Sequence, residues 1–124
     1  MAKVYIACHA PDPANALAAV LRAAGHEVVS DWHTETADRP PRASSSVWVE
    51  KSRHNCGLIE KSDALVVICD GEMHPGGKWI EAGLAYPMKP VFVIGAVENG
   101  MSHLFSHVSG EETLLQQIRY ELGD

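Results

Sequence analysis

The sequence predicts an α/β fold in which helices cover both faces of one parallel sheet. Apolar segments of strand length alternate along the chain with segments whose apolar residues recur every three or four positions, the period of a helix. Residues 64–69 are apolar without interruption, which is typical of a central parallel strand buried on both faces. These two observations predict a doubly wound sheet of four or five parallel strands.

The first strand and the first helix are predicted between residues 4 and 25. Residues 4–7 form a buried strand. Asp12 is a candidate cap for the following helix, and Pro13 suits the first turn because proline lacks the N–H that would be unpaired there. The helix carries one apolar face, and Gly25 supplies a natural stop.

A second strand and a second helix follow, separated by a long polar segment. The strand spans residues 27–30, and the segment 34–46 is too long for a simple connection, as loops that cover a binding site often are. The helix spans residues 47–61, with Ser45 or Ser46 as its cap. Its apolar face is incomplete, so we expect this helix to be partly exposed.

The second half of the chain continues the alternation. Strands are predicted at 64–69 and 90–94, with a glycine-rich loop and a helix over 78–86 between them. Ser109 and Glu112 form a capping box, which predicts a last helix that closes the domain.

The elements together predict one domain over residues 1–124. A chain of 124 residues suffices for one hydrophobic core and is too short for two. Val108 belongs to a short fifth strand if the sheet has five strands. We expect a flavodoxin-like or Rossmann-like order of layers.

The composition excludes some classes of partner. The chain is 46% apolar and 21% charged, with a net charge of −6, whereas a protein that neutralises a nucleic-acid backbone carries a basic excess. No stretch approaches the roughly 20 apolar residues that cross a bilayer, and the first apolar run is too short for a signal peptide. We therefore expect a cytoplasmic protein with no nucleic-acid or membrane partner.

The cysteine and histidine residues do not indicate a disulfide framework or a metal site. The three cysteines are odd in number and have no Cys-x-x-Cys spacing. His103 and His107 have the spacing of two ligands on one helical face, but no third ligand has a matching spacing, so a surface pair is favoured. We expect neither a metal nor a cofactor.

Polar side chains follow the ends of the predicted strands, where ligands bind in open α/β sheets. Trp32 lies at this edge, so it is a better candidate to stack on an aromatic ligand than Trp79, which lies on a helix. The residues at this edge are Cys8 and His9 after the first strand, Asp31, Trp32 and His33 after the second, Asp70 to His74 after the third, and Val97 to Asn99 after the fourth.

The helix that follows the third strand carries a candidate catalytic group. Gly76 and Gly77 let a ligand approach the backbone at the helix start, where unpaired N–H groups favour anionic or hydroxyl groups. Glu81 lies one turn further among apolar neighbours, which suits a nucleophile or a general base. The alternative is a first-turn glutamate that only complements the helix dipole.

Three segments of the chain resemble the nucleoside 2-deoxyribosyltransferase family and its relatives, the deoxynucleoside 5′-monophosphate N-glycosidases. The segments are Val4-Tyr5-Ile6-Ala7, then Ser62-Asp63-Ala64-Leu65-Val66-Val67, and finally Gly77-x-x-x-Glu81-x-Gly83-x-Ala85 followed by Lys89-Pro90-Val91. The resemblance rests on the order and spacing of these segments, and it covers most of the chain.

The resemblance implies a two-step reaction on a nucleoside or its 5′-monophosphate. Glu81 matches the glutamate that attacks the anomeric carbon and forms a covalent glycosyl-enzyme, which a second base or water then resolves with retention. Tyr5 matches a tyrosine that orients this glutamate. The resemblance also implies a homo-oligomer, a dimer or a larger even-numbered assembly.

The chain departs from the family pattern at two positions that hold or protonate the base. The transferases carry aspartates where this chain has Asn55 and Pro75. Asn55 can hydrogen-bond a base edge but cannot act as an acid. Asp70 and His74 are candidates to replace the missing aspartates.

We therefore predict cleavage or transfer of an N-glycosidic bond in a nucleoside or nucleoside 5′-monophosphate. The alternative is a non-catalytic nucleotide-binding module on the same fold. The predicted catalytic residues are Glu81, Tyr5 and Asp70. The predicted substrate-binding residues are Cys8, His9, Trp32, Asn55, His74, Gly76, Gly77 and Asn99.

Overall fold

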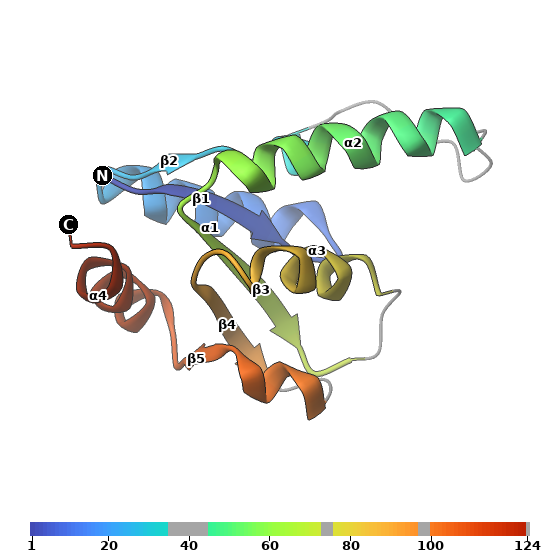
Figure 1. Cartoon of the computed structure of the whole chain (residues 1–124). Helices are drawn as coiled ribbons and strands as arrows, with labels where there is room; N and C mark the ends of the chain where they lie inside the picture. The colour runs from blue at the N-terminus through green and yellow to red at the C-terminus, as the bar shows by residue number, and fades with distance from the viewer. Residues whose placement is uncertain (35–44, 73–75, 97–99, 124) are drawn as a thin grey trace.

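The chain folds into a five-stranded parallel sheet with helices on both faces (Figure 1). The computed structural model describes residues 1–34, 45–72, 76–96 and 100–123. The strands are β1 (Lys3–Ala7), β2 (Glu27–Val28), β3 (Ala64–Asp70), β4 (Val91–Ala96) and β5 (Ser106–Val108). The helices are α1 (Pro11–Ala23), α2 (Ser45–Lys61), α3 (Gly77–Ala85) and α4 (Glu111–Leu122), with two short 3₁₀ helices, η1 (Trp32–Thr34) and η2 (Gly100–Leu104).

The strand order is β2-β1-β3-β4-β5, and every neighbouring pair is parallel. This order confirms the predicted doubly wound fold and is that of the flavodoxin-like type. The order reverses between β1 and β3, since the chain first adds β2 on one side of β1 and then β3 on the other. Ligands of such folds bind at this switch point.

Two apolar cores lie on opposite faces of the sheet. One core joins the even-numbered residues of β1 to α1 and α4, where Leu21 and Ile118 are fully buried. The other core joins Tyr5 and Ala7 to α2 and α3, where Ala82 is fully buried. Because successive strand residues point to opposite faces, Tyr5 faces α2 and α3.

All the predicted strands and helices are present, and the second strand is shorter than expected. It ends at Val28, whereas the prediction continued to Ser30. The Val29 N–H still donates to the Val4 carbonyl at 2.9 Å, and beyond Val29 two side chains take the place of the backbone ladder. The Ser30 hydroxyl accepts the Ile6 N–H at 3.0 Å, and the Trp32 indole N–H donates to the Ile6 carbonyl at 2.8 Å.

The predicted helix caps are wrong, because each helix begins at a different residue. The first helix starts at Pro11 with Ala10 as its N-cap, since proline suits the first helical position, and Asp12 lies in the first turn. The second helix begins at Ser45 and so includes both candidate cap serines.

The last helix does not have the predicted capping box. Its N-cap is Gly110, whose extended backbone leads into a first turn that carries Glu111 and Glu112. The Ser109 hydroxyl instead contacts the Thr113 hydroxyl at 2.9 Å. Val108 belongs to β5, so the predicted fifth strand is confirmed.

The histidine pair does not share a helix. His103 lies in η2 and His107 in β5, with ring centroids 5.8 Å apart, and His107 Nε2 donates to the Ser102 carbonyl at 2.8 Å. Across the four described ranges, none of the helices is long and apolar enough to cross a membrane.

Candidate functional site

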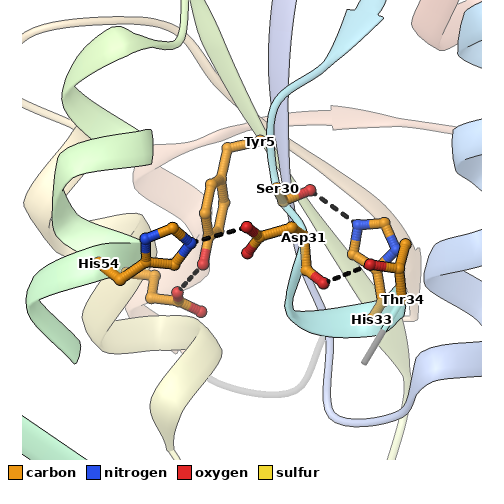
Figure 2. A network of polar contacts seen from close by, with 7 residues as sticks. Tyr5, Ser30, Asp31, His33, Thr34 and His54 are labelled. Atoms are coloured by element: carbon orange, nitrogen blue, oxygen red, sulfur yellow. Dashed lines mark hydrogen bonds and ion pairs between the residues drawn. The ribbon is translucent and has the colours of Figure 1, made fainter. Parts of the chain in front are cut away.

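Tyr5 and Glu81 meet between the sheet and α3. The Tyr5 side chain is fully buried on β1, and its hydroxyl donates a hydrogen bond to Glu81 Oε2 (Figure 2). Ala82 and Ala85 hold α3 against the sheet, so the half-buried Glu81 side chain lies above β1. The strand ladder and the helix packing together fix the position of this carboxylate.

The environment keeps the Tyr5 hydroxyl protonated. Burial raises the pKa of Tyr5 well above its ordinary value, and the charge of Glu81 and the hydrogen bond to it raise it further. Tyr5 is therefore a neutral donor across the physiological pH range. A hydroxyl that donates to a carboxylate orients it and leaves its other oxygen available for chemistry.

A cavity of about 480 Å³ opens beside Glu81, at the carboxyl end of β1 and against the helix that follows β3. It lies at the switch point of the strand order. The walls come from the end of β1, from η1, from α2 and from α3. The lining residues are Cys8, His9, Trp32, Trp48, Ser52, Asn55, Cys56, Ile59, Gly77, Lys78, Ile80, Glu81 and Leu84.

One face of α2 forms a long wall of this cavity. Its residues are spaced by four, three, one and three positions, which places them on one side of a helix. This face mixes aromatic, polar and apolar side chains, and that mixture explains the incomplete apolar pattern of the sequence. Asn55 is the member that the sequence predicts. The wall residues are Trp48, Ser52, Asn55, Cys56 and Ile59.

The opposite wall holds the predicted stacking residue. Trp32 is fixed by its bond to the Ile6 carbonyl and by an edge-on contact with His33, whose ring centroid is 5.2 Å away. Trp79 instead stacks on Phe105 at 6.2 Å between ring centroids, and it does not line the cavity. The arrangement agrees with the preference for Trp32 over Trp79 at the sequence level.

The amino end of α3 adds a buried lysine that the sequence analysis missed. Lys78 is only 3% exposed, and its ammonium donates to the Ile68 carbonyl at 3.2 Å and lies 5.6 Å from the centroid of the Trp79 ring. A cation in the first turn opposes the helix dipole, so these contacts compensate an unfavourable position. Lys78 brings positive charge to a cavity that also holds Glu81.

The two glycines at the helix start have different places. Gly77 lines the cavity, so its backbone is open to a ligand. Gly76 does not line it; it is the N-cap residue, and its carbonyl accepts the N–H groups of Trp79 and Ile80 at 3.0 and 3.1 Å.

Asp70 lies next to the cavity without lining it. One oxygen of its carboxylate is 3.6 Å from Nε2 of His9, which does line the cavity, and the other accepts the Glu72 N–H at 2.9 Å. His74 and Asn99, with Pro75, lie outside the described residues.

Glu81 is the one carboxylate among the described lining residues. The remaining ionisable groups there are two thiols, His9 and Lys78. In the part of the chain that the structure describes, no three His, Cys, Asp or Glu side chains are arranged to hold a metal ion. The chemistry available is thus a positioned carboxylate in an otherwise neutral or basic cavity.

Neither a protein-family model nor a curated protein matches the sequence. Solved structures do match. The 2-deoxyribosyltransferase from Bacillus psychrosaccharolyticus has a TM-score of 0.71 at 20% identity, over 91% of this chain and 90% of that one. The CMP N-glycosidase from Clostridium botulinum has a TM-score of 0.61 at 17% identity, over 94% and 97%.

A conserved protein from Enterococcus faecalis V583 has a TM-score of 0.67 at 21% identity, over 97% of this chain and 98% of that one. Each alignment spans almost the whole of both chains, so no large insertion separates them. This chain therefore has the flavodoxin-like fold that the 2-deoxyribosyltransferase and the CMP N-glycosidase share.

Proposed function

We propose that this protein is a member of the nucleoside 2-deoxyribosyltransferase-like family that cleaves or transfers the N-glycosidic bond of a nucleoside or nucleoside 5′-monophosphate. The observation that carries the proposal is the Tyr5–Glu81 hydrogen bond beside a cavity at the switch point. Two neighbours in fold are named as a 2-deoxyribosyltransferase and a CMP N-glycosidase, enzymes of this bond type.

In the proposed first step Glu81 is the nucleophile. One of its carboxylate oxygens attacks the anomeric carbon of the sugar, while Tyr5 holds the other. The bond between the anomeric carbon and the base nitrogen breaks, and its electron pair leaves with the base, which takes up a proton from solvent. The product is a glycosyl ester of Glu81.

In the second step water or another base attacks the same carbon. The ester C–O bond breaks, its electron pair returns to Glu81, and the attacking group loses a proton. Two inversions give net retention of configuration. The choice of acceptor separates hydrolysis from transfer.

The walls of the cavity suit the parts of such a substrate. Trp32 offers a fixed aromatic face for the base, and Asn55 on α2 offers an amide for its edge. Gly77 and the amino end of α3 suit a hydroxyl or a 5′-phosphate, with His9 close by. We assign Cys8 to the same substrate-contacting wall. Asp70 acts through His9 in this proposal.

A second candidate function is nucleotide binding without turnover. It is favoured by the absence of a second carboxylate from the described lining residues, because a departing base needs a proton donor. Among the described lining residues, His9 and Lys78 are the side chains with an ionisable nitrogen. A binding module would keep the same cavity and the same stacking residue.

One experiment separates these functions. The purified protein is incubated with ribo- and deoxynucleosides and their 5′-monophosphates, with and without a free acceptor base, and base release is followed by chromatography. We expect release by the wild type, and a loss of about 10³-fold or more in Glu81→Gln because the nucleophile is removed. Glu121→Gln, an exposed change on α4, is the control and keeps full activity.

The variants also identify the alternative. Ligand-dependent thermal stabilisation with no base release, in wild type and Glu81→Gln alike, supports the binding module. Base release that Glu81→Gln leaves unchanged rules out the proposed nucleophile.

We also propose that the protein is a homo-oligomer of even number. Three exposed apolar side chains follow one line along α3 and the turn after it, four residues apart: Ile80, Leu84 and Met88, at 67%, 50% and 71% exposed. Ile80 and Leu84 also form the outer rim of the cavity. A second copy on this line would close the open side of the site.

A further inference from the structure

A second carboxylate approaches the Tyr5 hydroxyl from the segment after β2. Figure 2 shows the Asp31 carboxylate beside the Tyr5 side chain. The charge of Asp31 adds to the effects of burial and of Glu81 that raise the pKa of Tyr5, so the two groups are electrostatically close. The hydroxyl of Tyr5 thus has two carboxylate neighbours and one proton to donate.

The two oxygens of Asp31 have different surroundings. Oδ2 accepts a hydrogen bond from His54 Nε2 on α2 at 2.7 Å (Figure 2). Oδ1 is shielded from solvent and has no hydrogen-bond partner among the described residues. Buried polar atoms are nearly always paired, so this unpaired carboxylate oxygen needs an explanation.

We propose that Asp31 is a positioning residue whose Oδ1 accepts the Tyr5 hydroxyl when Glu81 loses its charge in the glycosyl-enzyme. This inference rests on the proposed function. In the free protein the Glu81 carboxylate is the acceptor. Once Glu81 is an ester it is a weaker acceptor, because hydrogen bonds to ionised groups are about twice as strong as neutral ones. The charged Oδ1 of Asp31 is then the better partner.

The exchange favours the covalent step for a second reason. Before the reaction, two carboxylates lie close to one hydroxyl and repel each other in a partly buried site. Formation of the ester removes the charge of Glu81 and with it this repulsion. Asp31 therefore lowers the free energy of the glycosyl-enzyme relative to the free enzyme, without contacting the substrate.

His54 has a supporting part in this arrangement. Its bond to Oδ2 fixes the orientation of the carboxylate, so that Oδ1 is turned inward. Asp31→Asn keeps an oxygen to accept from His54 and removes only the charge. This substitution separates the electrostatic role from the link between α2 and the segment after β2.

The kinetic test is a double-mutant cycle with Tyr5. We expect Asp31→Asn to lower kcat about tenfold or more and to change KM less than about threefold, because the effect falls on the covalent step. In a Tyr5→Phe background the same substitution should change kcat less than about threefold, because the hydroxyl that Oδ1 accepts is gone and only the charge repulsion with Glu81 remains. Equal effects in the two backgrounds would overturn the inference.

Two further variants distinguish the proposed role of Asp31 from a purely structural one. Asp63→Asn is the matched control, since Asp63 also accepts one hydrogen bond, from the Lys3 N–H at 2.8 Å, at the other end of β3. It should leave kcat unchanged. If His54→Ala reproduces the whole effect of Asp31→Asn, and does so independently of Tyr5, the Asp31 carboxylate only holds α2 in place and the inference is wrong.

A crystal structure of the Glu81→Gln protein tests the exchange without any turnover. Glutamine has the size of glutamate and the neutral charge of the ester. We expect the Tyr5 hydroxyl oxygen within about 2.5–3.0 Å of Asp31 Oδ1. A hydroxyl that stays on the residue-81 side chain overturns the inference even if the enzyme is active. If the hydroxyl moves to Asp31 in this variant but the wild type cleaves no substrate, only the proposed function is refuted.

Discussion

Protonation of one buried residue, His33, opposes folding. Its ring is 2% exposed; Nδ1 donates to Asn15 Oδ1 at 2.7 Å, and Nε2 lies 2.9 Å from the Ser30 hydroxyl. Since Ser30 already accepts the Ile6 N–H, its own proton is available to Nε2, and the ring is neutral. Burial lowers the pKa of His33 below its ordinary 6.5, and the charge of Arg22 adds to this shift.

The lowered pKa predicts a loss of stability in mild acid. Below about pH 6.5 the unfolded chain binds a proton at His33 before the folded chain does, so the free energy of unfolding falls as the pH falls. The slope from this group is at most about 1.4 kcal/mol per pH unit, and the contribution is complete above pH 6.5. Urea unfolding between pH 5 and 7.5 measures it.

His33→Gln should remove this part of the slope, whereas His103→Gln, at an exposed histidine, should keep it. Parallel slopes for wild type and His33→Gln would show that the buried ring does not control the acid limit. Ser30, which contacts His33, and Trp32 both bond to the backbone of Ile6. The loss of stability in acid therefore also affects a wall of the cavity.

The residues of the site were predictable where the sequence constrains them locally. The glycine-rich helix start indicates Glu81, and an edge position distinguishes Trp32 from Trp79, whereas Tyr5 was indicated only by the resemblance to the transferase family. Lys78, Trp48 and their neighbours were not predicted, because a helix face that lines a cavity has the same spacing as one that packs on a sheet. Only the packing of α2 against α3 decides between them.

Among the elements, α2 depends on a cap from a distant part of the chain. Lys89, after α3, donates from Nζ to the carbonyls of Ile59, Glu60 and Ser62 at 2.5, 3.1 and 2.7 Å. These carbonyls lie at the end of α2, where a helix has no partners of its own and favours a cation. The Lys89-Pro90-Val91 segment thus has a structural role.

Lys89→Met should destabilise the protein by about 1–3 kcal/mol, because it leaves polar carbonyls without their donor. Lys61→Met removes an exposed lysine from the last turn of the same helix and should cost less than about 0.5 kcal/mol. The free energy of unfolding in urea compares them. Equal values for the two variants would mean that the helix end is adequately solvated.

The elements were predicted better than their ends. Apolar periodicity identifies every strand and helix, since it depends on which face is buried. The caps of α1 and α4 and the end of β2 failed because they depend on single hydrogen bonds. At β2, the Ser30 and Trp32 side chains compete with the backbone for Ile6, and no periodicity reports such competition.

The whole molecule combines predictable layers with an order that packing decides. Continuous apolar strands predict a parallel sheet with helices on both faces. The flavodoxin-like order appears only when β3 pairs with β1 and not with β2. That pairing brings the helix after β3 over the first strand, and so it creates the contact between Glu81 and Tyr5.

The same arrangement leaves an apolar line on the outside of α3, and this predicts assembly. Contiguous exposed apolar surface is unusual on a monomer. We expect an even-numbered homo-oligomer by light scattering. Met88→Glu should weaken the association of the subunits about 100-fold or more, because a buried interface cannot solvate the new charge.

Met88 does not line the cavity, so activity lost by this variant and regained at high protein concentration would show that a neighbour completes the site. Tyr120→Glu, at an 86% exposed residue of α4, is the control. A strictly monomeric wild type would contradict the assembly.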